Sequence, residues 1–240
     1  MPTKSEMEKL QKLEILLEPC RYFTELLGGE KFVSCSVVLP ALCHLSRVME
    51  ISEDDPAYIV KFKQTFSADM TSRKDKTNLT WLKISTALDP RFKDLKCLHR
   101  SERAEVWALI AGLLKEDIHG QQQVEETSSE PPNKKAALLF ASDSESDEEQ
   151  DDIKNCLTRY RAEPVLCKDE CPLEWWCKHA CIYNKLACLA KKYLATPATS
   201  VPCERLFSLS GHVVQKKRAA LSSRNVNKLV CLSSWLRSTQ

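Results

Sequence analysis

The segment from Ser200 to Leu236 constrains the fold of this chain more than any other part of the sequence. It reads as two helices joined by a basic connector. Ser200 is a residue type that caps helix N-termini, and Pro202 is tolerated in a first turn, where its missing N–H leaves no intrahelical bond unmade. Apolar residues then recur at helical spacing, at Leu206, Phe207, Val213 and Val214.

The second helix of this segment is apolar over an unusually wide part of its surface. We expect it to begin at Ser222 or Ser223. Its apolar positions include Val226, Leu229, Val230, Leu232, Trp235 and Leu236. A stripe that wide on a short terminal helix has to be covered from two sides. Either another part of this chain or a second copy of it provides the cover.

The near-neutral total charge hides two regions of opposite charge. The formal net charge is +2 over 240 residues, and the fractions of charged (28%) and hydrophobic (43%) residues are typical of a soluble globular protein. From residue 196 onward, seven basic residues stand against Glu204 alone, whereas residues 141–152 contain seven acidic residues and no basic one. The chain therefore has a basic end and an acidic central segment.

No stretch of the sequence is apolar over the length that a bilayer requires, and the charged N-terminus lacks a signal-peptide core. We therefore expect no membrane partner and a reducing compartment, in which the twelve cysteines act mainly as small core residues. The sequence suggests no cofactor and no small-molecule substrate.

Helical patterns dominate the chain and divide it into three parts. Residues 1–119 are predicted to be a helical domain, whose first helix begins at a capping box formed by Ser5 and Glu8. Residues 120–150 are rich in glutamine, serine, proline and acids, and are predicted to be an acidic disordered linker. Helical spacing returns over 151–163 and again from 172 to 194, so residues 151–240 form the third part.

Three motifs carry a family resemblance. The run S-V-P-C-E-R-L-F-S from Ser200 resembles the C-terminal dimerisation region of hAT-superfamily transposases and of host proteins derived from them. L-D-P-R-F-K from Leu88 and P-L-E-W-W from Pro172 resemble two upstream landmarks of the same family. The motifs occur in family order across most of the chain. The chain looks most like vertebrate BED-type zinc-finger proteins, although no paired cysteines precede a suitably spaced histidine pair, so the BED finger itself is missing.

The resemblance implies a mainly α fold, in which a helical insertion-type domain and a C-terminal dimerisation unit belong to an incomplete RNase H-like transposase fold. It also selects the second copy as the cover of the apolar stripe. The expected partner is therefore a homodimer or a higher homo-oligomer. The expected interface residues are Leu206, Phe207, Val226, Leu229, Val230, Leu232, Trp235 and Leu236.

Glu204 is the one residue that the resemblance connects to catalysis. In active members, the glutamate of the corresponding motif is the last carboxylate of a D-D-E site, which holds two divalent ions for phosphodiester cleavage. The resemblance places the two aspartates upstream of this chain, and Asp89 belongs to a different landmark. A lone carboxylate lacks the other ligands. We therefore expect no catalytic residue and no enzyme activity, with Glu204 vestigial.

A group of cysteines and one histidine invites a zinc interpretation, which its spacing opposes. The group comprises Cys167, Cys171, Cys177, His179, Cys181 and Cys188. The pattern C-x3-C-x5-C-x3-C is not a paired C-x2-C knuckle. On a helix, Cys177 and Cys181 share a face while His179 points elsewhere. We therefore expect no metal site.

The basic connector is the candidate for contact with DNA. Its cations are Lys216, Lys217, Arg218 and Arg224. They suit sequence-independent binding of phosphates, but clustered charge without a groove-entering motif equally describes a solvated loop. The sequence thus favours a non-catalytic, domesticated transposase-derived protein that dimerises in the nucleus, with a DNA-associated or transcription-regulatory role. Two alternatives stay open, namely a component of an active transposase that obtains its aspartates from another chain, and a DNA-independent interaction module.

Overall fold

The computed structural model describes residues 3–29, 35–125, 145–213 and 221–238. These residues form helices, and none of them lies in a β-strand, so the prediction of a mainly α fold is confirmed. No described helix is long and apolar enough to span a membrane. The helices in chain order are α1 (Lys4–Leu27), the 3₁₀ turn η1 (Cys35–Val37), α2 (Val38–Val48), α3 (Ala57–Lys74), α4 (Leu79–Leu88), α5 (Arg100–Glu125), α7 (Glu145–Ala162), α8 (Pro172–His179), α9 (Asn184–Leu194), α10 (Val201–Val213) and α11 (Ser223–Ser238).

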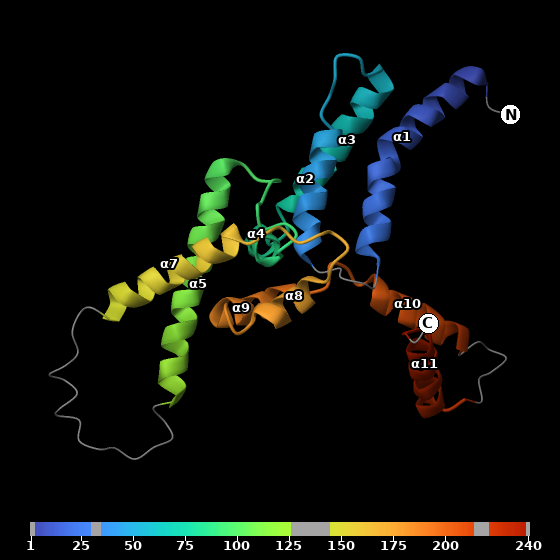
Figure 1. Cartoon of the computed structure of the whole chain (residues 1–240). Coiled ribbons are helices and arrows are strands. Elements are labelled where there is room, and N and C mark those ends of the chain that lie inside the picture. Colours follow the sequence, from blue (N-terminus) through green and yellow to red (C-terminus); the bar gives the residue numbers. More distant parts are fainter. Residues whose placement is uncertain (1–2, 30–34, 126–144, 214–220, 239–240) are drawn as a thin grey trace, which may run out of the picture.

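The first helix begins two residues earlier than its sequence pattern suggested. The capping box is formed by Thr3 and Glu6, not by Ser5 and Glu8. The backbone N–H of Thr3 donates to Glu6 Oε2 over 2.7 Å, and the N–H of Glu6 donates to Thr3 Oγ1 over 3.4 Å. These bonds satisfy backbone donors that have no partner within the helix. The helix then projects from the molecule (Figure 1) and buries none of its residues.

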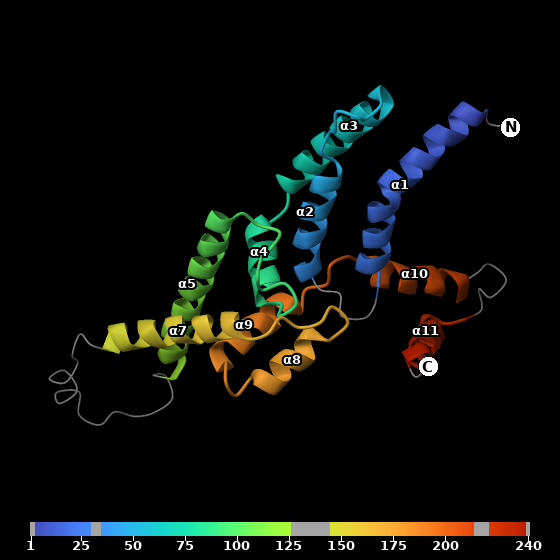
Figure 2. The ribbon, with the colours of Figure 1, turned by 45° about the horizontal axis from the view of Figure 1, so that its top comes forward.

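The hydrophobic core is built around α4. This short helix lies between α2, α5 and α9 (Figures 1 and 2), and its second half is buried from Ile84 to Leu88. Because neighbouring helices cover α4 on several sides, the buried residues of its second half include the polar Ser85 and Thr86 as well as apolar ones. It ends at Leu88, with Asp89 as its C-cap.

One core joins the segments on the two sides of the predicted linker. Helix α7 packs on α5, which brings Ile153, Leu157 and Tyr160 into the same buried cluster as Val106 and Ile110. The two helices also enter the range 120–150, because α5 continues to Glu125 and α7 begins at Glu145. Residues 126–144 of the predicted linker lie outside the described residues.

The segment from 172 to 194, which the sequence suggested to be a single helix, is two helices. The first ends at His179, whose carbonyl accepts hydrogen bonds from the N–H groups of Ile182 and Tyr183, both over 3.0 Å. This turn directs Tyr183 into the core, where its hydroxyl donates to Glu163 Oε1 over 2.8 Å. The break allows α8 and α9 to fold back on each other beneath α4 (Figure 2).

Helices α10 and α11 lie apart from this core. Figures 1 and 2 both show them beyond the C-terminal end of α1, away from α5 and α7. The two helices contact each other. Among the described residues, none after Leu194 belongs to the buried core cluster. The helices α1 to α9 together are called the core unit below. The C-terminal helix pair is thus attached to this core unit rather than embedded in it.

Candidate dimerisation surface

The apolar residues of α10 and α11 are largely exposed in the single chain. Phe207 exposes 74% of its surface and Trp235 exposes 66%. Leu206, Leu229, Leu232 and Leu236 are also exposed, and Val226 and Val230 are half-buried. Together these eight residues form what we call the α10–α11 face. These are the eight interface residues predicted from the sequence, and the other described residues leave most of their surface accessible.

The α10–α11 face is attached through a small seam between α1 and the start of α10. The hydroxyl of Thr199 donates to the carbonyl of Leu27 over 3.3 Å. A Cβ on Gly28 would lie 3.1 Å from the carbonyl oxygen of Thr24 and 3.6 Å from Val201 Cγ1. The short distance is to α1 itself, whereas 3.6 Å to Val201 is an ordinary van der Waals distance, so the start of α10 lies against the end of α1 without requiring a glycine there. The seam fixes where α10 leaves the core unit and leaves its apolar face uncovered.

Glu204 is exposed in the first turn of α10. Its Oε1 accepts a hydrogen bond of 2.6 Å from the hydroxyl of Ser200, and its backbone N–H donates to the Ser200 carbonyl over 3.0 Å. A carboxylate at this position also interacts favourably with the helix dipole. Among the described residues, no group of three or more histidine, cysteine, aspartate or glutamate side chains is placed to hold a metal ion. The geometry places the Glu204 carboxylate in a local side-chain hydrogen bond at the start of α10.

The L-D-P-R-F-K motif forms a buried network of polar contacts around Asp89. Asp89 is fully buried, and its carboxylate is 2.8 Å from Arg91 Nη2. It also accepts hydrogen bonds from Arg91 Nε over 3.0 Å, from the Arg91 backbone N–H over 3.0 Å and from the Ser36 hydroxyl over 2.7 Å. A buried carboxylate is tolerated only when it is bonded in this way. The motif therefore ties α4 to η1, and Asp89 is not available as a metal ligand.

Lys93, the last residue of the same motif, closes the C-terminal end of α7. Its buried ammonium group donates to the carbonyls of Tyr160 (2.8 Å), Arg161 (3.3 Å) and Glu163. A cation at this position satisfies carbonyls that the helix leaves open and complements the helix dipole. Burial lowers the pKa of Lys93, and the charges of Asp94 and Glu163 oppose that shift.

The P-L-E-W-W motif meets L-D-P-R-F-K around Tyr160. The indole N–H of Trp176 donates to the Leu88 carbonyl over 2.8 Å, and its ring centroid is 5.0 Å from that of Tyr160. Tyr160 is fully buried, and its hydroxyl donates to the Ala87 carbonyl over 3.2 Å. Burial, followed by the charge of Asp89, raises the pKa of Tyr160 well above its usual value. The two upstream landmarks thus contact each other and stabilise the core.

The cysteine and histidine group is spread over the surface of α8, α9 and the loops beside them. Cys167, Cys177, Cys181 and Cys188 are exposed. The ring of His179 stacks on Trp175 with centroids 3.9 Å apart, and its Nδ1 lies 2.7 Å from the Trp175 carbonyl. This histidine is held by its own helix.

Of the four cations predicted to contact DNA, the structure describes only Arg224. Lys216, Lys217 and Arg218 lie outside the described residues. Arg224 is exposed in the first turn of α11. Its position next to the α10–α11 face leaves it accessible to a ligand.

Sequence reasoning missed two features that depend on distant residues. One is a basic cavity between α5 and α7, described below. The other is a contact between the thiols of Cys43 and Cys97, because a hydrogen bond from Cys97 lowers the pKa of Cys43 to about 7 and raises that of Cys97. The charges of Lys74 and Arg47 lower the Cys43 pKa further. No local sequence motif indicates either feature, since the residues that form it are far apart in the sequence.

Comparison with known proteins assigns the C-terminal third of the chain. Residues 156–236 match the hAT family C-terminal dimerisation region. The chain is also 34% identical over 85 residues to two proteins of Zea mays, "Putative AC transposase" and "Putative AC9 transposase". Each match covers 34% of this chain and 10% of the maize protein, so the chain spans about a tenth of the length of these relatives. The matched region includes the C-terminal part of α7, helices α8 and α9, and the α10–α11 face, so residues 156–236 of this chain are similar to a hAT C-terminal dimerisation region.

Proposed function

We propose that this protein is a non-catalytic descendant of a transposase, which forms a homodimer or higher homo-oligomer through the α10–α11 face and acts in the nucleus in a DNA-associated or transcription-regulatory role. The observation that carries the proposal is the exposure of the α10–α11 face, inside the region that matches the family's dimerisation region.

A second copy of the same surface is the cover that suits this face best. Large apolar residues gather on two neighbouring helices, whereas a monomeric protein scatters such residues singly. Phe207 and Trp235 are of the aromatic class that supplies most of the binding energy in interfaces. A two-fold symmetric contact would place the face against its own copy.

The non-catalytic part of the proposal is supported by the surroundings of Glu204. Two-metal cleavage of a phosphodiester needs several carboxylates that share two ions. The Glu204 carboxylate instead accepts a hydrogen bond from Ser200. The Asp89 carboxylate forms an ion pair with Arg91 and accepts a hydrogen bond from Ser36. The DNA-associated part is supported by the basic composition of the segment from Lys216 to Arg224.

Light scattering on the purified full chain tests the dimer. We expect the wild type to have at least twice the monomer mass, and Leu229→Asp and Trp235→Asp to dissociate it while the helical circular dichroism is retained. Loss of a central aromatic residue costs at least about 2 kcal/mol in typical interfaces, which is roughly a 30-fold weaker dimer. Asn227→Asp adds the same charge at an exposed polar position of α11 and should leave the dimer intact.

Light scattering and a DNA-nicking assay together distinguish the alternatives. A folded wild-type monomer at all concentrations would contradict the homodimer and leave the face for a different partner, as in a DNA-independent interaction module. Metal-dependent nicking of DNA by the purified chain, lost in Glu204→Gln, would contradict the non-catalytic proposal and identify Glu204 as part of a shared site.

A further inference from the structure

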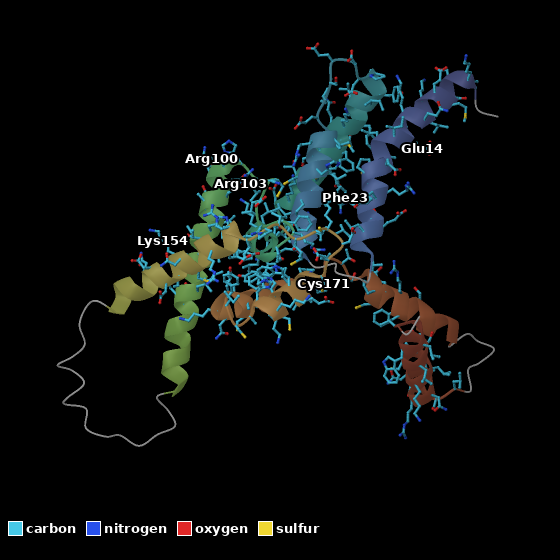
Figure 3. All side chains as sticks on the ribbon, in the orientation of Figure 1. Glu14, Phe23, Arg100, Arg103, Lys154 and Cys171 are labelled. Carbon is cyan, nitrogen blue, oxygen red and sulfur yellow. The ribbon has the colours of Figure 1, made fainter. Side chains whose placement is uncertain are left out.

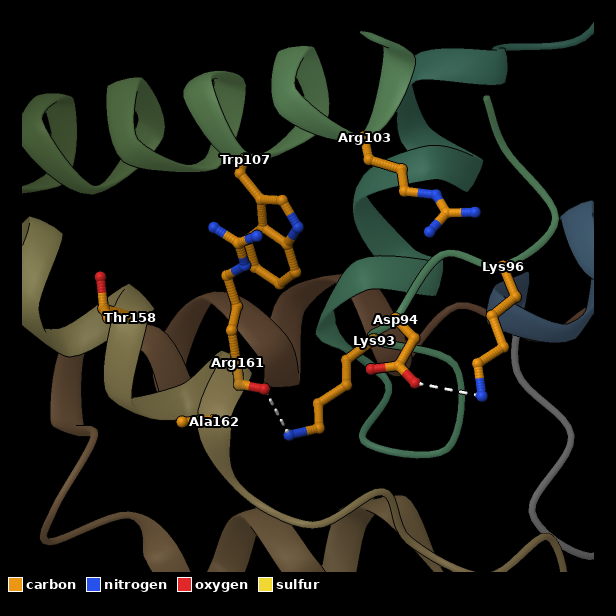
Figure 4. Close-up of a pocket in the computed structure, with 8 residues that line it drawn as sticks. All are labelled: Lys93, Asp94, Lys96, Arg103, Trp107, Thr158, Arg161 and Ala162. Carbon is orange, nitrogen blue, oxygen red and sulfur yellow. Dashed lines mark hydrogen bonds and ion pairs between the residues drawn. The ribbon is translucent and has the colours of Figure 1, made fainter. Parts of the chain in front are cut away.

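An open cavity of about 560 Å³ lies between α5, α7 and the loop that follows α4 (Figure 4). Helix α5 contributes Arg103 and Trp107, and α7 contributes Thr158, Arg161 and Ala162, while Lys96 comes from the loop. The volume lies in the range of sites that bind small molecules or single groups of larger ligands. None of these residues belongs to the α10–α11 face.

The charges that line this cavity are not balanced. Asp94 is its acidic residue, and Lys96 forms an ion pair with it over 3.3 Å. The ammonium group of Lys93 is occupied by three backbone carbonyls, so it contributes positive charge but no free donor. What remains is a pair of guanidinium groups on two different helices.

Both guanidinium groups are held by the protein without being neutralised. Arg103 is half-buried, and its Nε donates to the Leu98 carbonyl over 2.9 Å, while its guanidinium group extends away from Trp107 and toward the loop that carries Lys96 (Figure 4). The guanidinium carbon of Arg161 lies 5.3 Å from the ring centroid of Trp107, which is 8% exposed. Among the described residues, neither arginine has a carboxylate within ion-pair distance.

This arrangement suits a phosphate group. A guanidinium group offers planar, paired donors that match phosphate oxygens, and one that is already fixed by a carbonyl or an aromatic ring loses little entropy on binding. The cavity opens to solvent past exposed residues such as Thr158 and Ala162, so a group that belongs to a longer chain can enter.

The surface around the cavity extends the positive charge. Arg100 and Lys154 are exposed on α5 and α7, and Figure 3 shows them on the same two helices that form the cavity. The acidic residues of α7, including Asp151 and Asp152, precede its C-terminal half. A polyanion that followed the basic side would therefore contact the C-terminal half of α7 and the N-terminal half of α5.

We propose that this cavity binds a phosphodiester group of DNA, with Arg103 and Arg161 as the phosphate ligands. The site extends the DNA-associated role proposed above into the core unit. It requires neither the basic connector nor the dimer, so the two proposals can fail separately.

The test is a titration of a fluorescent random-sequence DNA duplex with the full chain at several salt concentrations. Ala162→Glu places a carboxylate at the mouth of the cavity without removing any contact of the native protein, and Ala57→Glu makes the same change at the exposed start of α3. Arg161→Gln removes one ligand, whereas Arg161→Lys keeps the charge. Circular dichroism of each variant establishes that it is folded.

We expect Ala162→Glu and Arg161→Gln to weaken binding and Ala57→Glu to leave it unchanged. Each lost phosphate contact lowers the slope of log affinity against log salt by about 0.9, so the fall in affinity between about 50 and 200 mM salt becomes about threefold smaller per contact. Arg161→Lys should restore most of the slope.

Three results would overturn the proposal. The first is equal affinity and slope for the wild type and Ala162→Glu. The second is binding at the cavity of inorganic phosphate or of a phosphoserine peptide, detected by calorimetry and lost in Ala162→Glu, while DNA binding stays unchanged in that variant. The third is a wild type that does not bind DNA at all. Leu229→Asp, tested in parallel, should keep the cavity-dependent slope per chain even if it is monomeric, which separates this site from the dimer.

Discussion

The core unit and the α10–α11 pair differ in the side chains that they bury and expose. The core unit buries charged residues, among them Asp89 and Lys93, and provides each with several hydrogen bonds. The helix pair exposes apolar residues such as Phe207 and Trp235. A buried charge is tolerated when its partners lie in the same chain, whereas an exposed apolar surface becomes favourable when something else covers it.

The difference assigns separate tasks to the three motifs that resemble the family. L-D-P-R-F-K and P-L-E-W-W meet around Tyr160 and hold one chain together. The motif that contains Glu204 begins the helix pair, where the Ser200 hydroxyl and the Glu204 carboxylate are hydrogen-bonded in the first turn of α10. Changes in the first two motifs should therefore alter the stability of the monomer, and changes in the helix pair should alter the association of monomers.

The largest effect is expected for Asp89→Ala. This change leaves the guanidinium of Arg91 buried without its carboxylate, and the removal of one partner from a buried ion pair typically costs about 3–5 kcal/mol. The free energy of unfolding, measured by urea denaturation of the monomeric Leu229→Asp background, should fall by that amount. Asp94→Ala serves as the control, because its ion pair with Lys96 is exposed and should contribute less than about 1 kcal/mol.

A loss below about 1 kcal/mol in Asp89→Ala would contradict the comparison. It would mean that Arg91 reaches solvent or another partner when the carboxylate is removed. The double variant Asp89→Ala with Arg91→Met separates the two cases, since the removal of both charges should restore part of the stability if Arg91 stays buried.

A smaller effect is expected for Lys93→Met. The substitution keeps the length of the side chain but leaves the carbonyls of Tyr160, Arg161 and Glu163 without their donor. We expect the free energy of unfolding to fall by about 1–3 kcal/mol, and the last turn of α7 to exchange its amide hydrogens faster. Lys96→Met is the matched control, because the exposed Lys96 bonds no helix terminus. Equal stability losses in the two variants would show that Lys93 does not hold α7.

The change Trp176→Phe should cost about 1 kcal/mol. Phenylalanine keeps an aromatic ring beside Tyr160 but removes the hydrogen bond from the indole N–H to the Leu88 carbonyl. The measurement is urea denaturation, as before. The neighbouring Trp175→Phe is the control, since Trp175 is half-buried and only packs at the edge of the core. A loss in Trp175→Phe as large as that in Trp176→Phe would locate the effect in ring packing instead of the hydrogen bond.

The sequence predicted the helices well and their partners poorly. Apolar spacing identified α7, α10, α11 and the range that contains α8 and α9, because a helix that packs on one face shows its period locally. The break between α8 and α9 was missed, because Tyr183 is directed inward by the hydrogen bond from its hydroxyl to the Glu163 carboxylate and by the core rather than by a glycine or proline. The capping box at Thr3 was missed in favour of an equally good pattern two residues later.

Of the two candidate sites, only the dimerisation surface could be predicted from the sequence. The α10–α11 face could be identified because all of its residues lie on two consecutive helices. The cavity at Arg103 and Arg161 could not, since these residues are far apart in the sequence and line one cavity only because α7 packs on α5. The burial of Asp89 and Lys93 could not be predicted either. A charged residue is expected at the surface unless the partners that bind it in the core are known.

The smallest effect on the core is expected from removing the helix pair altogether. A chain that ends at Ala198 loses the hydrogen bond from Thr199 to the Leu27 carbonyl and the contact of Val201 with α1, but no residue of the buried core described here. Its free energy of unfolding should therefore match that of the monomeric Leu229→Asp chain to within about 1 kcal/mol, the size of one hydrogen bond. Its unfolding midpoint should also be independent of protein concentration, whereas that of the wild-type dimer should rise with concentration. A truncated chain that is several kcal/mol less stable, or that no longer unfolds in a single transition, would place α10 and α11 within the folding unit of the core.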